Sequence, residues 1–189
     1  MAKPKVLILR APGTNCDQET SFAFRTAGAE AELLHVNQLL EDVRAIRQFQ
    51  ILCIPGGFSY GDDVAAGRIL GNQFRHHLAT ALQEFKAAGN LILGICNGFQ
   101  VLTKSGILLA EDDSGEPLAT LTWNDSGKFE DRWVELRTDG TSCVFLQGIE
   151  SMYLPVAHAE GKFVVRHEAA RTALDKAGQL VLRYAGARG

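Results

Sequence analysis

The sequence predicts an α/β protein with a central, mostly parallel sheet, helices on both of its faces and an antiparallel extension in the C-terminal third. In the first half of the chain, short runs of large apolar residues such as Val6–Leu9 and Ile51–Ile54 alternate with segments of helical period. Continuous apolar runs are typical of parallel strands that are buried on both faces. In the second half, extended segments follow one another without a helix between them, which favours antiparallel pairing.

The size and composition of the chain indicate an ordinary globular domain. With 189 residues, it is long enough for one well-formed domain and short for two, so we expect a single domain over residues 1–189. Hydrophobic residues make up 46% of the chain and charged residues 22%, and the formal net charge of -3 gives no reason to expect nucleic-acid binding.

The cysteines and the N-terminus indicate a soluble protein of the reduced cytoplasm. Cys16, Cys53, Cys96 and Cys143 lie far apart with no C-x-x-C pair, so neither a zinc site nor a dense disulfide framework is indicated. The N-terminus leads into a strand too short for a signal sequence, and no apolar run approaches the roughly 20 residues of a membrane span.

The first half of the chain alternates strands with helices. Apolar runs predict strands at Val6–Leu9, Ile51–Ile54 and Leu91–Leu93, and we expect a further strand at Ala31–Val36. Helices are expected up to about Ala27 and over Gln38–Phe49, Ala65–Ala88 and Gly98–Lys104. Asn15 or Asp17 is suited to cap the first helix, and Gly28 to end it. This order of elements predicts a parallel sheet.

The second half of the chain contains mostly strands. We expect strands at Leu118–Thr122, Trp133–Arg137, Met152–Val156 and Gln179–Tyr184, with a short helix at Glu168–Lys176. The turn residues Asn124–Gly127 separate the first two strands. Successive strands of this kind predict an antiparallel extension at the edge of the main sheet.

Cys96 stands where a predicted strand becomes a helix. It lies in Gly94-Ile95-Cys96-Asn97-Gly98, a Gly-x-Cys-x-Gly pattern that corresponds to a nucleophile elbow with sulfur in place of oxygen. The glycines permit a sharp turn and a close approach of the two elements, and the start of the helix favours the thiolate. The N–H of Asn97 is placed to donate to an oxyanion. We therefore predict that Cys96 is a nucleophile rather than a small core residue.

A second glycine-rich turn, Pro55-Gly56-Gly57, follows the strand Ile51–Ile54. Paired glycines at the carboxyl end of a parallel strand allow N–H groups to point into the crevice where open α/β sheets bind ligands. Gly57 is therefore the second predicted oxyanion donor. A plain flexible loop is the alternative, and the position one βα unit before the elbow favours the functional interpretation.

Three other features are candidates of lower rank. Cys16 also lies at a helix start and could be a second reactive thiol, but it lacks the elbow. His76 and His77 are adjacent on a helix, point to different sides and are expected on the surface. His158 and Glu160 would share one face of a strand and could act as a base and its orienting group.

Several motifs together resemble class I (triad) glutamine amidotransferases, and more narrowly the glutaminase subunits of phosphoribosylformylglycinamidine synthase in purine biosynthesis. The resemblance extends from near Lys5 to near Tyr184. It rests on the elbow Gly94–Gln100 and on the stretches Pro12–Asp17, Pro55–Asp62 and Ala157–Phe163.

The resemblance implies a flavodoxin-like class I amidotransferase fold and a reaction. Cys96 would attack the side-chain amide of glutamine, form a glutamyl thioester and release ammonia, with the Gly57 and Asn97 N–H groups holding the oxyanion and Gln100 helping to position the glutamine. No cofactor or metal is implied in this chain. ATP and magnesium are expected on a partner synthetase subunit, which would receive the ammonia, and a small accessory subunit is expected in the same complex.

The sequence departs from this family at one point. The family's catalytic histidine and glutamate lie in an H-P-E motif near the carboxyl terminus, whereas His158 and Glu160 match a different stretch. We therefore expect a domain truncated at its C-terminus, with that pair beyond Gly189, and a chain that is a poor glutaminase by itself.

Two alternatives stay open at this point. The chain could be a non-catalytic, partner-binding module of the same fold, which ammonia release in the presence of the synthetase would distinguish. It could instead belong to the cysteine-elbow peptidases and stress proteins, in which case thiol oxidation would occur without glutaminase activity.

Overall fold

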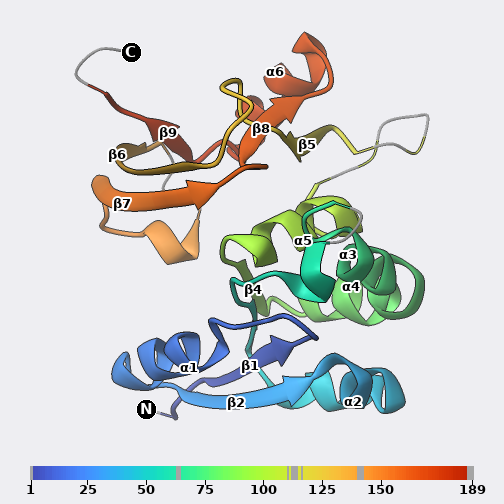
Figure 1. Ribbon diagram of the computed structural model, residues 1–189. Coiled ribbons are helices and arrows are strands. Elements are labelled where there is room, and N and C mark those ends of the chain that lie inside the picture. Colours follow the sequence, from blue (N-terminus) through green and yellow to red (C-terminus); the bar gives the residue numbers. More distant parts are fainter. Residues whose placement is uncertain are drawn as a thin grey trace. The chain divides into compact units, whose positions relative to one another are not determined.

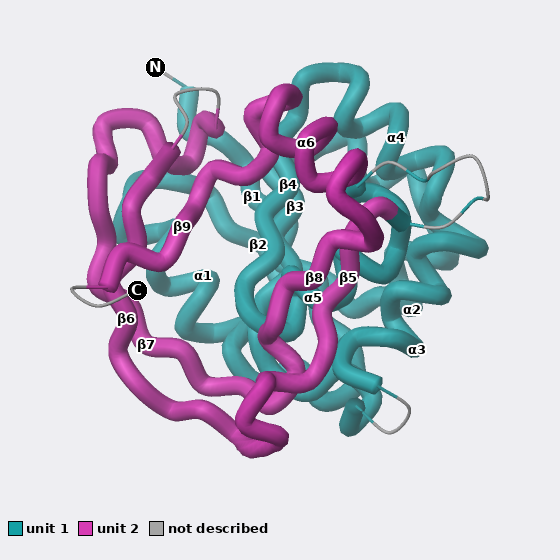
Figure 2. Tube along the Cα trace, turned by 90° about the horizontal axis from the view of Figure 1, so that it is seen from above, with its two compact units in different colours: residues 1–117 teal, residues 118–189 magenta. Residues whose placement is uncertain are grey.

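The computed structural model describes residues 2–62, 65–109, 111, 115, 117–139 and 143–186. The chain forms two compact units, Met1–Pro117 and Leu118–Gly189, which are coloured separately in Figure 2 and are called unit 1 and unit 2. No helix among these residues is both long enough and apolar enough to cross a membrane.

Unit 1 contains a parallel four-stranded sheet (Figure 1). Its strands are β1 (Lys5–Arg10), β2 (Glu30–His35), β3 (Ile51–Ile54) and β4 (Leu91–Gly94). They lie in the order β2-β1-β3-β4, and each neighbouring pair is parallel. All four predicted strands are therefore confirmed. The carboxyl ends of β1, β3 and β4 meet at one edge of this sheet, because parallel neighbours run in the same direction.

The helices of unit 1 match the predicted segments but are more broken. They are α1 (Asp17–Thr26), α2 (Val36–Glu41), the 3-10 segments η1 (Val43–Gln48) and η2 (Ser59–Asp62), α3 (Arg68–Gln73), the π segment η3 (Phe74–Leu78), α4 (Ala79–Ala87) and α5 (Asn97–Ser105). Cys16 stands at the N-cap of α1 without a side-chain cap, so the expectation that Asn15 or Asp17 caps this helix is wrong.

The helix predicted over Gln38–Phe49 is divided in two. Asp42 leaves helical geometry, with φ -135° and ψ 86°, and its side chain accepts a hydrogen bond of 3.1 Å from the Arg44 N–H. Aspartate competes in this way for backbone donors, which ends one helix and begins the next.

The sheet of unit 1 buries both of its faces, as a doubly covered parallel sheet should. Alternate residues of β1 separate into two hydrophobic clusters: Leu7 and Leu9 pack in the larger cluster with α3, α4 and α5, and Val6 and Ile8 in the smaller one with Phe24 of α1. All four β1 side chains are almost completely inaccessible to solvent. The continuous apolar run in the sequence thus corresponds to two faces, each covered by its own helices.

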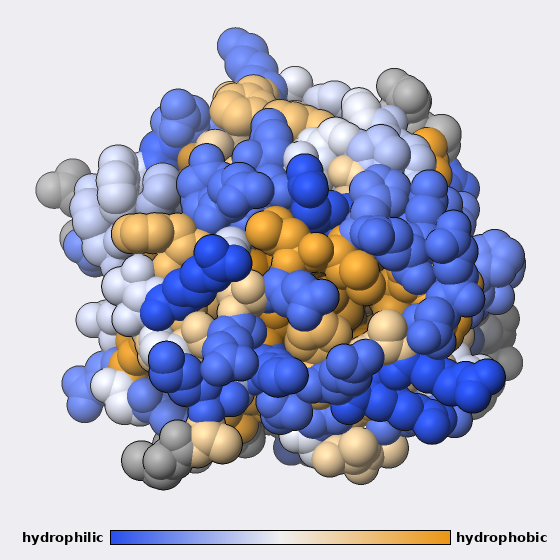
Figure 3. Space-filling view, turned by 90° about the horizontal axis from the view of Figure 1, so that it is seen from below, coloured by the Kyte–Doolittle hydropathy of each residue, from blue (hydrophilic) through white to orange (hydrophobic). Residues whose placement is uncertain are grey.

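The edge strand β2 is covered less completely. Leu33 and Leu34 are half-buried there, and Figure 3 shows hydrophobic residues gathered on the side of unit 1 where β2 forms the edge, surrounded by hydrophilic ones.

Unit 2 is built from antiparallel strands. These are β5 (Ala119–Thr122), β6 (Glu130–Thr138), β7 (Ser151–His158), β8 (Lys162–Val165) and β9 (Leu182–Tyr184), accompanied by the 3-10 turn η4 (Val144–Leu146) and α6 (Glu168–Lys176). They form one sheet of β5 and β8 and another in the order β7-β6-β9. The antiparallel pairing is confirmed, but among the described strands it occurs in sheets of its own rather than along the edge of the parallel sheet. Strand β8 was not predicted.

Candidate active site

Cys96 occupies a strained backbone position between β4 and α5. Its φ is 52° and its ψ is -113°, outside the regions that non-glycine residues ordinarily populate. Strain of this kind costs on the order of 1–3 kcal/mol and is concentrated at functional sites. The side chain of Cys96 is exposed and its thiol is free. The elbow geometry that the sequence predicts is therefore present.

The elbow glycines allow α5 to approach the sheet closely. A Cβ added at Gly98 would lie 1.9 Å from the carbonyl oxygen of Ile54 on β3. A Cβ at Gly94 would lie 2.7 Å from the carbonyl oxygen of Gly98. Both distances are far below van der Waals contact, so any side chain at either position would push the helix away from the strands.

The Gly56-Gly57 turn lies directly beside Cys96. A Cβ added at Gly56 would be 3.4 Å from the Cβ of Cys96. Gly57 has a φ of +134°, which side-chain-bearing residues rarely adopt, and a Cβ there would lie 2.7 Å from the Asn15 backbone nitrogen. Position 57 therefore requires glycine both for its backbone conformation and for the space around it.

The loop that follows β1 holds the Gly56-Gly57 turn in place. Thr14 and Gly57 form an isolated antiparallel bridge. The Phe58 N–H donates to the Gly13 carbonyl over 3.0 Å, and the Cys16 N–H to the Gly56 carbonyl over 3.4 Å. The loops after two neighbouring strands are thus joined beside the elbow.

The side chain of Asn97 joins the elbow to the same turn. Asn97 is buried, and its Oδ1 accepts a hydrogen bond of 3.1 Å from the Ser59 N–H. Its Nδ2 donates to Asp62 Oδ1 and to Gln100 Oε1, each over 3.0 Å. Sequence reasoning assigned only a backbone role to Asn97 and missed this bridge. Gln100 is buried as well, and its Oε1 is the acceptor of one of these hydrogen bonds.

Two backbone N–H groups remain available at this site. Among the described residues, neither the Gly57 nor the Asn97 N–H donates a hydrogen bond. Asn97 is the first residue of α5, where N–H groups have no partner within the helix. Unpaired donors next to a nucleophile are what the stabilisation of an oxyanion requires.

The other thiols have different surroundings. Cys53 is completely buried in β3, and burial raises its pKa to about 12. Cys143 lies in unit 2 and is half-buried. Cys16 is exposed, and its Sγ lies 3.6 Å from the position that a Gly56 Cβ would occupy. The sequence did not reveal that Cys16 and Cys96 both lie beside Gly56. The glycines in both loops were the only signal of this approach.

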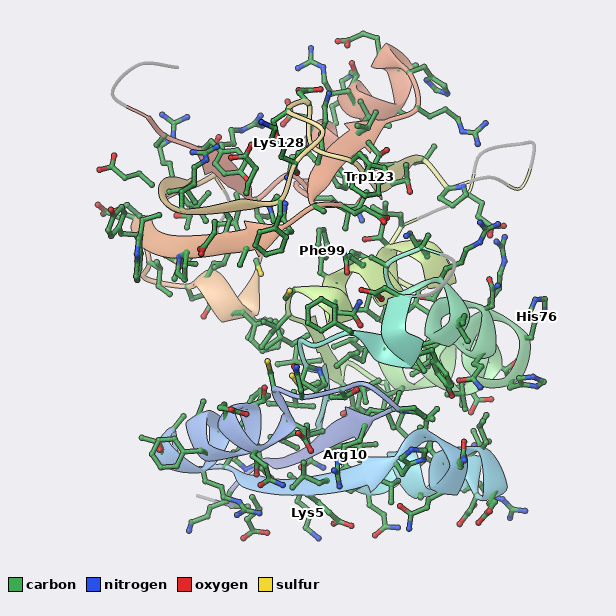
Figure 4. All side chains as sticks on the ribbon, viewed as in Figure 1. Lys5, Arg10, His76, Phe99, Trp123 and Lys128 are labelled. Carbon is green, nitrogen blue, oxygen red and sulfur yellow. The ribbon has the colours of Figure 1, made fainter. Side chains whose placement is uncertain are left out.

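The candidate histidines lie on the surface or contact other residues. His76 is exposed and points outward from unit 1 (Figure 4), as expected for a surface residue. In unit 2, His158 Nδ1 lies 3.0 Å from Asn124 Oδ1, and the Asn124 Nδ2 donates to the His158 carbonyl over 2.8 Å. His158 ends β7, and a Cβ at Gly161 would overlap its ring. His158 is thus held between Asn124, which follows β5, and the turn that contains Gly161. Among the described residues, no group of three or more metal-ligating side chains occurs.

Comparisons of the sequence and of the structure with known proteins indicate the same family. A family model described as a CobB/CobQ-like glutamine amidotransferase domain matches residues 3–189. The phosphoribosylformylglycinamidine synthase subunit PurQ of Dehalococcoides mccartyi is 53% identical over 165 residues, which are 87% of this chain and 64% of that protein. The PurQ subunit of Methanococcus maripaludis is 40% identical over 187 residues, which are 98% of this chain and 69% of that protein.

A solved structure shows the same fold. A chain in the structure of PurLQS from Thermotoga maritima superposes with a TM-score of 0.72 and 30% identity, covering 98% of this chain and 76% of that one. The present chain therefore spans about two thirds to three quarters of the length of these relatives.

Proposed function

Since this chain belongs to the family of CobB/CobQ-like glutamine amidotransferase domains, and within it to the PurQ subunits of phosphoribosylformylglycinamidine synthase, we propose that it is a glutaminase that supplies ammonia for purine biosynthesis. The family model spans both units, which supports a single amidotransferase domain over the chain. The observation that carries the proposal is the strained Cys96 elbow with the Gly56-Gly57 turn beside it.

The reaction is an acyl transfer through a thioester. The Cys96 thiolate attacks the carbon of the glutamine side-chain amide, and the carbonyl oxygen becomes an oxyanion held by the N–H groups of Gly57 and Asn97. When the carbon–nitrogen bond breaks, the nitrogen takes a proton and leaves as ammonia. Water then attacks the thioester, which releases glutamate and restores the thiol.

Turnover also needs a general acid for the leaving nitrogen and a general base for the water. Such groups contribute about 10²- to 10⁴-fold in rate. We do not assign them to His158 and Glu160, because His158 Nδ1 already contacts Asn124 Oδ1 in the turn that follows β5. Gln100 is proposed to act on the substrate through the Asn97 side chain.

The ammonia requires an acceptor, which we propose is bound to another subunit. A synthetase subunit that uses ATP and magnesium would convert formylglycinamide ribonucleotide to formylglycinamidine ribonucleotide, and a small accessory subunit would complete the complex. The solved relative is itself a PurLQS structure, which supports this arrangement. We propose no cofactor for this chain itself and a cytoplasmic location.

Labelling with a diazoketone analogue of glutamine tests the nucleophile. We expect the analogue to modify Cys96 alone, free glutamine to protect it, and Cys96→Ser to remain unlabelled. Iodoacetamide, which needs no glutamine site, serves as the control for thiol access. Labelling first at Cys16, or labelling that glutamine does not slow, would overturn the assignment. A complete lack of analogue labelling alongside normal iodoacetamide labelling would favour the partner-binding module.

A substitution at Gly57 tests the oxyanion site. In Gly57→Val, the side chain would meet the Asn15 backbone and force the turn out of its conformation. We expect ammonia release in the presence of the synthetase to fall by about 10²-fold or more, the effect of losing one oxyanion donor. Glutamine affinity should change less. Full turnover in this variant would exclude Gly57 as a donor.

A further inference from the structure

Two exposed, free thiols, those of Cys16 and Cys96, lie beside Gly56. The Cys96 Cβ lies 3.4 Å, and the Cys16 Sγ 3.6 Å, from the point where a Gly56 Cβ would stand. These two atoms are therefore at most about 7 Å apart, the sum of those distances, and the charge of Cys96 is one of the causes that raise the pKa of Cys16, so the two thiols are neighbours. The third exposed or half-exposed thiol, Cys143, belongs to unit 2.

The space between the two thiols exists because residue 56 has no side chain. Gly56 has no positive φ, so its backbone conformation is open to any residue. A methyl group there would make ordinary van der Waals contacts with both cysteines. A side chain at position 56 would therefore restrict how the two cysteine side chains can turn.

The backbone holds Cys16 at this place. Its N–H donates to the Gly56 carbonyl over 3.4 Å. The following residue, Asp17, forms an ion pair of 2.6 Å with Arg10 at the end of β1, labelled in Figure 4. The start of α1 is therefore tied to both loops. These bonds involve the backbone of Cys16 and its neighbour Asp17, and they do not involve the Cys16 thiol.

The surroundings of Cys16 suit a thiol that reacts second. Partial burial and the negative charges of Glu19, Cys96 and Asp17 raise the pKa of Cys16. Its S–H donates to Asn15 Oδ1 over 3.3 Å, which also favours the protonated thiol. Both thiols stand at the N-terminal end of a helix, Cys16 at that of α1 and Cys96 at that of α5, so the hydrogen bond and the nearby negative charges at Cys16 are what leave Cys96 as the thiol placed to react first.

We propose that Cys16 and Cys96 form a disulfide modification site that takes hydroperoxides, with Cys96 oxidised first and Cys16 as the resolving thiol. The Cys96 thiolate attacks one peroxide oxygen, the oxygen–oxygen bond breaks, and hydroxide leaves, so that Cys96 becomes a sulfenic acid. The Cys16 thiolate then attacks that sulfur and displaces a second hydroxide. Together the two thiols lose two protons and two electrons, and hydrogen peroxide becomes two molecules of water.

This disulfide would protect the nucleophile as well as block it. A sulfenic acid without a neighbouring thiol proceeds to the sulfinic acid, which thiol reagents do not reduce. A disulfide is reduced by dithiol exchange, which returns both cysteines. The pair therefore converts an irreversible loss of Cys96 into a reversible one.

The test is peroxide oxidation of the full chain followed by peptide mapping without reduction. We expect a cross-linked peptide that joins Cys16 to Cys96, and dithiothreitol should restore iodoacetamide labelling of Cys96. In Cys16→Ser, we expect sulfinic acid at Cys96 and no recovery with dithiothreitol. Cys143→Ser is the matched control and should behave like the original chain.

Gly56→Ala tests the path between the thiols. The added methyl group should force off-rotamer side chains and slow the cross-link by about threefold to tenfold. A chain in which Cys96 proceeds to the sulfinic acid although Cys16 is present would overturn the proposal. So would equal recovery in Cys16→Ser, or a cross-link that uses Cys143. These experiments measure only the oxidation state of the cysteines, so their outcome does not depend on whether the chain hydrolyses glutamine.

Discussion

Replacing Asn97 by alanine should weaken unit 1 and the proposed site together. The change removes the bonds of the Asn97 carboxamide to Ser59, Asp62 and Gln100. A neutral hydrogen bond contributes about 1 kcal/mol net and one to a charged group about 2 kcal/mol, which gives about 4 kcal/mol for the three. A chain of this size should then melt about 10 °C lower.

The same substitution should also slow the reaction. Without the bond to the Ser59 N–H, the Gly56-Gly57 turn loses a tie to the elbow, and a displacement of about 1 Å at a reacting centre can cost about 10²-fold. We expect slower labelling by the diazoketone analogue and unchanged labelling by iodoacetamide. The control is Asn72→Ala, because Asn72 is exposed on α3. If both variants melted at the same temperature and reacted equally with the analogue, the bridging role of Asn97 would be refuted.

Three further outcomes are expected. Gly98→Ala should destabilise unit 1 by about 3 kcal/mol or more in urea titration, since its Cβ would overlap the Ile54 carbonyl; a loss under about 1 kcal/mol would contradict the close approach. The raised pKa of Cys16 should make its alkylation slow at neutral pH and faster as the pH rises, and Glu19→Gln should increase the rate at neutral pH. Burial raises the pKa of Cys53 to about 12 in the folded chain, so from about pH 9 upward the thiol ionises only in the unfolded chain. Calorimetry should therefore show a loss of stability between about pH 9 and about pH 12, and Cys53→Ala should lack this loss.

Local patterns in the sequence were sufficient for much of unit 1. All four parallel strands were predicted, and the apolar runs of β1 and β3 are continuous because residues buried on both faces need no alternation. The Gly-x-Cys-x-Gly pattern predicted the elbow, because few other conformations need glycine at both positions. The break at Asp42 was missed, since helical periodicity does not report that a side chain competes for backbone donors.

The remaining features depend on contacts between distant segments. Strand β8 is recognisable only through its pairing with β5. The approach of Cys16 to Cys96 depends on the order of β1, β3 and β4 in the sheet, which the sequence alone did not reveal. The hydrogen bonds of the Asn97 side chain likewise connect residues up to 38 positions apart.

The strained backbone at Cys96 also bears on how such a chain can evolve. A residue with a φ of 52° and a ψ of -113° lowers the stability of the fold whether or not the thiol reacts. Glycine at this position would relieve the strain at once, and it is one base change away from cysteine in the genetic code. A chain that only binds a partner would therefore gain from that replacement, whereas one that uses the thiol would lose its chemistry. A chain that lost its catalytic role and kept only partner binding would therefore be expected to replace this cysteine early.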